Sequence, residues 1–321
     1  KSAASIRLDM EAEFPLAEAA KLFKSDIATV ITDFKTTSPP LIQLEAAIFN
    51  KAYSEYVDKS HIDLCANLDH PLTYKDVPLD HLSFKLFGRS KVAHLREIKL
   101  GYADGQATAM IDIFMPVESK NSLRYALALK DADQKQALRD LPQFDHIEGS
   151  LQSIKTTKPE LEDARIDLNI RGQGPTEDAF KHKGFGHFEI RNDKLGTIQL
   201  LGPLSKILQN TQLSFTSFNL NNMRGDFLYK DDLVTFDPLR IDGDRTQIDT
   251  PGTLCLSDQT LKMNVEVKLF GNAGKPGSKL RKIGDLITKP IPNLLQFELT
   301  GTLKDQGLRS LYDPRNLIPD L

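Results

Sequence analysis

Apolar and polar residues alternate one by one along much of this chain, and this pattern limits the folds that it can adopt. Residues 261–269 are the clearest case, because Leu261, Met263, Val265 and Val267 alternate with polar residues. A two-residue period places neighbouring side chains on opposite faces of a β-strand. The same alternation occurs at residues 6–14, 61–68, 82–86, 107–113, 125–129, 166–170 and 223–229. We therefore expect a mainly β protein.

Turn sequences separate these segments in the manner of antiparallel hairpins. Asp104-Gly105 is a typical hairpin sequence, and Asp231-Asp232 and Ser257-Asp258 occupy similar places. Helical segments are too few and too irregularly spaced for a parallel α/β sheet. An antiparallel sheet with one apolar face must hide that face, which a sandwich, a closed barrel or a curled sheet would each achieve.

Short helices are expected between some strands. Residues 184–209 begin as a strand, turn at Asn192-Asp193 and continue with leucines at helical spacing. Segments 16–24, 26–34 and 131–141 also have helical or amphipathic patterns. We expect two short helices, at residues 200–208 and 278–289, to cap the sheet through Leu200, Leu204, Leu208, Leu280, Ile283, Leu286 and Ile287.

Composition and motifs argue against several classes of function. The net charge of −3 disfavours a nucleic-acid-binding protein, and no apolar run approaches the length of a transmembrane helix. The two cysteines are too far apart for a Cys-rich metal site. The glycine-rich segment 271–279 lacks the Gly-Lys-Ser/Thr order of a phosphate-binding loop. We expect no enzyme activity, no metal and no cofactor.

A family resemblance comes from the order of motifs in the second half of the chain. Residues 200–208 (LLGPLSKIL) precede a hairpin from Gly225 to Phe236 and the segments 239–243 (LRIDG) and 251–254 (PGTL). The closing motif is Leu-Thr-Gly-Thr-Leu at residues 299–303. This order resembles the C-terminal module of the AsmA-like proteins of diderm bacteria. A proline often follows the closing motif in that family, whereas this chain has Asp305-Gln306-Gly307.

The resemblance implies both a domain division and a function. Residues 1–147 look like an N-terminal β-repeat segment with short helices, and residues 148–321 resemble the AsmA-like C-terminal module. The family implies a long, curved antiparallel sheet that forms an apolar, gutter-like groove. It also implies a periplasmic protein, anchored in the inner membrane by a segment absent here, that holds or moves phospholipid towards the outer membrane and supports outer-membrane biogenesis.

The expected partners are phospholipid acyl chains, the membrane surface and other envelope proteins, without nucleic acid. The alternative function is a non-enzymatic scaffold of the cell envelope with a dry, side-chain-filled core. The residues expected to line a groove are Phe188, Ile190, Phe215, Phe227, Met263, Val265, Val267, Phe297 and Leu299.

Overall fold

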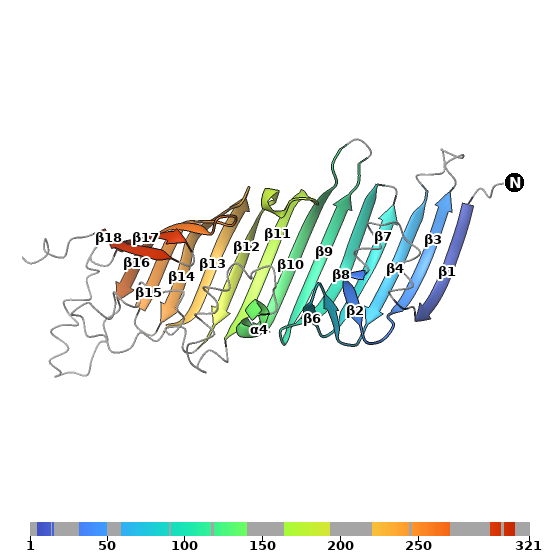
Figure 1. The fold of residues 1–321 in the computed structure, drawn as a ribbon, viewed down its shortest axis with the longest axis horizontal. Coiled ribbons are helices and arrows are strands. Elements are labelled where there is room, and N and C mark those ends of the chain that lie inside the picture. Colours follow the sequence, from blue (N-terminus) through green and yellow to red (C-terminus); the bar gives the residue numbers. More distant parts are fainter. Residues whose placement is uncertain are drawn as a thin grey trace, which may run out of the picture. The chain divides into compact units, whose positions relative to one another are not determined.

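The computed structural model describes residues 5–13, 15, 32–49, 59–89, 91–116, 119–139, 164–192, 220–243, 246–269, 296–302 and 305–311. Within these ranges the protein is mainly β, as the sequence predicts, and Figure 1 shows the strands side by side. Fifteen of the described strands form one antiparallel sheet, in the order β1-β3-β4-β7-β8-β9-β10-β11-β12-β13-β14-β15-β16-β17-β18. The sheet is open, and β1 and β18 are its two edge strands.

The strand order of the large sheet follows the order of the chain. Its strands are β1 (Ser5–Glu13), β3 (Leu41–Phe49), β4 (His61–Leu68), β7 (Leu82–Arg89), β8 (Val92–Tyr102), β9 (Gly105–Phe114), β10 (Ser122–Asp133), β11 (Arg165–Pro175), β12 (Lys183–Arg191), β13 (Leu220–Lys230), β14 (Leu233–Gly243), β15 (Thr246–Cys255), β16 (Thr260–Leu269), β17 (Gln296–Thr302) and β18 (Gln306–Ser310). A second, three-stranded sheet has the order β2-β5-β6, from β2 (Phe34–Thr36), β5 (Leu72–Tyr74) and β6 (Val77–Leu79). The described helices are α4 (Gln134–Arg139) and the 3₁₀ turn η3 (Ala179–Lys181).

Tight turns with two left-handed residues join several strands. The β8–β9 hairpin turns through Ala103 (φ 52°) and Asp104 (φ 57°), and the β13–β14 hairpin turns through Asp231 (φ 48°) and Asp232 (φ 75°). Positive φ at both central residues is the type I′ geometry that suits the twist of paired strands. The turns predicted at Asp104-Gly105 and at Asp231-Asp232 are therefore confirmed, although the first lies one residue earlier than its sequence suggested. Ser257-Asp258, the third predicted turn, lies between β15 and β16.

Gly105 has a different role from the one that its turn sequence suggested. It pairs with Tyr102 as the first residue of β9. A Cβ atom at this position would lie only 2.6 Å from Cα of Ala132 on β10. The glycine is needed for this close backbone approach.

Several local features of the structure differ from simple strand alternation or from the expected helices. β8 is one strand with a bulge at Glu97, whose φ is 51°. Pro251 and Gly252 both lie inside β15. The helix predicted at residues 131–141 begins only at Gln134, because Asp131–Asp133 continue β10. Phe34 lies in β2 rather than in a helix, whereas residues 16–31 lie outside the described ranges.

The chain divides into two compact units. Unit 1 comprises Lys1–Gln143 with Asp167–Gly184, and unit 2 comprises Phe144–Ile166 with Phe185–Leu321. The division between residues 147 and 148 that the family resemblance implies stays a prediction.

The core of unit 1 lies where the small sheet packs against the large one. Leu72 of β5 is buried in a cluster with Ala66, Leu68, Leu82 and Ile98 of the large sheet. Phe34 of β2 and Leu79 of β6 pack against the same cluster. The small sheet therefore covers part of one face of the large sheet.

Candidate functional site

One face of the large sheet in unit 1 is built almost entirely from apolar side chains. Residues directly opposite each other in an antiparallel pair point to the same face. The pairs on this face include Ile6 with Ile48, Leu64 with Leu86, Leu95 with Ile111, and Ala109 with Leu127. We call this surface, carried by alternate residues of β1, β3, β4 and β7–β10, the unit 1 apolar face.

The unit 1 apolar face is closed at one end of its strands. There the small sheet packs on Leu68, Leu82 and Ile98, which are 7%, 7% and 8% exposed. Helix α4 lies at the same end, where the Tyr102 hydroxyl donates a hydrogen bond of 2.5 Å to the carbonyl oxygen of Ala137. Figure 1 shows α4, β2 and β6 gathered at this end of the strands. We call it the closed rim.

The opposite end of these strands is more exposed, and we call it the open rim. It is formed where β3 ends and β4 begins, and by the β7–β8, β9–β10 and β11–η3 connections. Apolar side chains of the face remain in contact with solvent here and towards the edge strand β1. The most exposed are Ile6 (65%), Ile48 (50%), Leu8 (45%) and Ile62 (36%). An exposed row of large apolar side chains is characteristic of a surface that binds another apolar group.

Unit 2 has an equivalent face, but its side chains are more deeply buried. The register pairs Ile241 with Ile248, Ile248 with Val267, and Val265 with Phe297. Ile248 is fully buried, and Ile241, Phe297 and Val265 are 3%, 4% and 5% exposed. We call this surface the unit 2 apolar face.

An aromatic cluster occupies the first strands of the unit 2 apolar face. The ring centroids of Phe188 and Phe227 are 6.3 Å apart, and Phe236 lies 6.3 Å from Phe188 and 6.1 Å from Phe227. These tilted and edge-on arrangements are favourable ones for aromatic pairs. Gly225 makes room for the cluster, since a Cβ there would lie 3.2 Å from the Phe188 ring.

Eight of the nine predicted lining residues are described, and the structure places them on the unit 2 apolar face. Met263 is opposite Leu299, Val265 is opposite Phe297, and Val267 is opposite Ile248. Phe188 contacts Phe227, and Ile190 is two residues further along β12. Phe215 lies outside the described residues, as do the seven predicted capping residues Leu200, Leu204, Leu208, Leu280, Ile283, Leu286 and Ile287.

Sequence reasoning selected no lining residue from the more exposed unit 1 apolar face. The same alternation is present at Ile6, Leu8, Ile48 and Ile62, so the face itself could have been found. The exposure of these residues could not have been predicted from the sequence, because it depends on where the small sheet packs.

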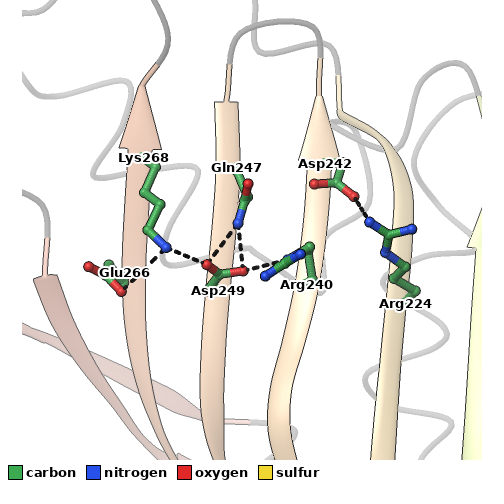
Figure 2. Close-up of polar contacts among 7 residues, drawn as sticks. All are labelled: Arg224, Arg240, Asp242, Gln247, Asp249, Glu266 and Lys268. Carbon is green, nitrogen blue, oxygen red and sulfur yellow. Dashed lines mark hydrogen bonds and ion pairs between the residues drawn. The ribbon is translucent and has the colours of Figure 1, made fainter. Parts of the chain in front are cut away.

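The opposite face of unit 2 carries a network of charged and polar side chains, which Figure 2 shows. Asp249 on β15 accepts hydrogen bonds from Arg240 Nε at 2.9 Å and from Lys268 Nζ at 2.7 Å. Gln247 also donates to both of its carboxylate oxygens. Arg224 and Asp242 form a neighbouring ion pair at 3.2 Å. These contacts join β13, β14, β15 and β16 across their polar face.

Asp249 remains ionised although its side chain is only 8% exposed. Burial opposes its charge, but the hydrogen bonds from Lys268, Arg240 and Gln247 together outweigh burial, so its pKa lies below the ordinary value. The arrangement leaves no unbalanced carboxylate of the kind that serves as a general base. We infer a structural role in joining the strands.

The polar face of unit 1 is joined in the same way. Asp112 accepts from Arg96 and from His94, whose Nδ1 lies 2.7 Å from the carboxylate. Desolvation opposes the charge of Asp112, yet these hydrogen bonds hold its pKa below the ordinary value. Arg89 donates two hydrogen bonds to Asp63, and this contact lowers the pKa of Asp63.

The described side chains form no group of three or more His, Cys, Asp and Glu residues that could hold a metal ion. None of the helices in the described ranges has the length and apolar character needed to span a bilayer. Comparisons with protein-family models, curated proteins and solved structures give no match.

Proposed function

We propose that the chain binds lipid acyl chains on the apolar face of its sheet and serves to hold or move phospholipid across the cell envelope. The observation that carries this proposal is the exposure of Ile6, Leu8, Ile48 and Ile62 on the unit 1 apolar face. The same face is buried at the closed rim, so the exposed side chains lie on the same surface as a buried apolar cluster.

The energetics of lipid transfer favour such a surface. Each CH₂ group that leaves an apolar environment for water costs about 0.8 kcal/mol. An acyl chain of a dozen carbons therefore faces a cost of roughly 10 kcal/mol when it enters water. A continuous row of aliphatic side chains removes much of this cost and needs no catalytic group.

The wider setting of the proposal comes from the resemblance to AsmA-like proteins. It would place the protein in the periplasm, attached to the inner membrane, with phospholipid as cargo and other envelope proteins as partners. In this proposal the protein has no enzyme activity and needs no cofactor.

A scaffold with a dry core is the second candidate, and the burial of the unit 2 apolar face favours it. Ile248, Ile241, Phe297 and Val265 are each at most 5% exposed, which is typical of a packed interior. Under this alternative the sheet would support other envelope proteins and would bind no lipid.

Lipid extraction from the purified protein separates the two candidates. The chain is expressed in a diderm bacterium, and the extract is analysed by mass spectrometry. We expect phospholipid in stoichiometric amounts, and reduced amounts in Ile48→Asp, which places a charge on the exposed apolar face. The control is Gln43→Asp on the polar face of the same strand. Absence of lipid from the unsubstituted protein would favour the scaffold.

A further inference from the structure

Strand β1 is an edge of the large sheet, and no described strand lies on the side of it that faces away from β3. Figure 1 shows it at the end of the row of strands in unit 1. Its nine residues pair one to one with β3, without a register shift. An edge strand presents regularly spaced backbone N–H and C=O groups on which another strand can pair. Bulges, prolines and short strands protect such edges in other proteins, whereas β1 carries only charged side chains for this purpose.

The apolar side chains of β1 are exposed beside this edge. Ile6 and Leu8 are 65% and 45% exposed, although both belong to the unit 1 apolar face. A strand added outside β1 would bring its own side chains to within about 4.5–5.5 Å of them, measured between Cβ atoms. The edge therefore offers both backbone groups and apolar side chains to an extended segment.

The polar face of β1 carries one cation and three carboxylates, which are Arg7, Asp9, Glu11 and Glu13. Arg7 lies opposite an alanine of β3, whereas Asp9 lies directly opposite Glu45. Glu11 accepts a hydrogen bond from Gln43 Nε2 at 3.2 Å. Like charges directly opposite each other destabilise a strand pair. A cation on the next strand outward would therefore stabilise the pair formed by Asp9 and Glu45.

A second copy of β1 supplies such a cation. Two copies that pair antiparallel about a two-fold axis perpendicular to the sheet keep their apolar side chains on the same face. Each symmetric register is centred on one residue, which then lies opposite its own copy. The register centred on Leu8 places Arg7 of each copy opposite Asp9 of the other. On the apolar face it places Leu8 opposite Leu8 and Ile6 opposite Met10.

The other symmetric registers that overlap five or more residues of β1 bring like charges together. Centring on Arg7 or on Asp9 places a charged residue opposite its own copy. Centring on the residue after Asp9 places Asp9 opposite Glu11, and centring on Glu11 places Asp9 opposite Glu13. The charges of β1 therefore select the register centred on Leu8.

We propose that β1 joins two copies of this chain into a symmetric dimer, with Leu8 at the two-fold axis. The two large sheets then continue into each other across the axis, and their unit 1 apolar faces lie on the same side. An interface that uses the same surface of both copies closes at two and forms no longer chain. This inference goes beyond the proposed function, because the pairing needs no bound lipid.

Sedimentation velocity of the full chain, over a range of concentrations, tests the dimer. We expect a monomer–dimer equilibrium. Arg7→Glu should raise the dissociation constant at least about tenfold, because two attractive pairs with Asp9 become repulsive. Asp9→Arg should act similarly. The double variant Arg7→Glu/Asp9→Arg should restore the dimer, because it exchanges the two charges and keeps both pairs attractive.

The matched control for these variants is Arg309→Glu on β18, the other edge strand, where Arg309 is exposed. It makes the same charge change as Arg7→Glu and should leave the dissociation constant unchanged. Equal loss of association in the two variants would overturn the proposal. So would a monomer at every concentration, or assemblies that grow beyond two copies, which would indicate pairing of β1 with β18.

Cysteine crosslinking tests the register, in a background that carries Cys65→Ser and Cys255→Ser. Leu8→Cys should form a disulfide between copies, because opposite Cα atoms in an antiparallel pair lie about 4.5–5.5 Å apart. Ile6→Cys should not, since the two copies of that residue would lie about 13 Å apart along the strands. Equal crosslinking of both variants, or a charge-exchanged double variant that stays monomeric, would overturn the register. Lipid that copurifies with a strictly monomeric protein would contradict the dimer and leave the lipid-binding function standing.

Discussion

Leu127 and Met110 lie on the neighbouring strands β10 and β9 but on opposite faces of the sheet. The register places Leu127 opposite Ala109 and Met110 opposite Ala126. Both side chains are exposed, Leu127 by 37% and Met110 by 52%. They are similar in size and differ chiefly in the face to which they belong.

This pair gives a direct test of which face binds lipid. We expect Leu127→Asp to weaken binding of a fluorescent fatty acid severalfold, because a carboxylate on the apolar face must be desolvated when an acyl chain covers it. Met110→Asp should leave the fluorescence titration unchanged. Equal effects of the two substitutions would contradict binding at the unit 1 apolar face.

The Asp249 network predicts a change in stability. Replacing Asp249 with Ala removes the acceptor shared by Arg240, Gln247 and Lys268. We expect a loss of about 2 kcal/mol in the free energy of unfolding, since hydrogen bonds to charged groups contribute about 1.5–3 kcal/mol. Urea denaturation followed by circular dichroism measures it. Asp242→Ala is the comparison, because Asp242 is more exposed and pairs with Arg224 alone among the polar contacts described here. A smaller loss is expected for it.

The lowered carboxylate pKa values predict a dependence of stability on pH. The pKa values of Asp63, Asp112 and Asp249 lie below their ordinary value, which is about 3.9 in an unfolded chain. Their contribution is complete above the unfolded pKa and is lost as the pH falls through the folded values. We expect the free energy of unfolding to fall between about pH 5 and pH 2. The fall should be smaller in Asp249→Asn, and an unchanged pH profile in that variant would contradict the assignment.

Substitution of Gly105 and of Gly88 by alanine should affect the stability of the protein differently. A Cβ at Gly105 would lie 2.6 Å from Cα of Ala132, whereas a Cβ at Gly88 would lie 3.5 Å from the nearest atom, the carbonyl oxygen of Ile62. We expect Gly105→Ala to destabilise the protein by about 1–3 kcal/mol through overpacking. Gly88→Ala should be close to neutral. Thermal unfolding of both variants compares them, and a neutral Gly105→Ala would contradict the described backbone approach.

Much of the large sheet could be predicted from the sequence, because a two-residue period is visible in any strand with one apolar face. The predicted strand at 61–68 coincides with β4. The small sheet escaped prediction, since β2, β5 and β6 each have three residues and are too short to show a period. The bulge at Glu97 was also missed, because it leaves the alternation intact on either side of a local shift.

The sequence could predict that an apolar face exists, but it could not predict which part of that face is exposed. Alternation predicts an apolar face at Ile48 as readily as at Val265. However, Ile48 is 50% exposed, whereas Val265 is only 5% exposed. That difference comes from tertiary packing, which a pattern along one strand cannot express. The polar face was similar: Asp249 has no local sequence feature that predicts its partner Lys268 on the next strand.

The strand order also determines how the stability of this protein would respond to the addition or removal of hairpins. Each strand of the large sheet bonds to its immediate neighbours in the order, and that order is the order of the strands in the chain. Such a sheet behaves as a linear array, in which stability is a sum of strand terms and neighbour terms. Hairpins could be added or removed near β1 or β18 with little effect on distant strands. The span of an apolar face is then a quantity that evolution can adjust by duplication of hairpins, without redesign of a core.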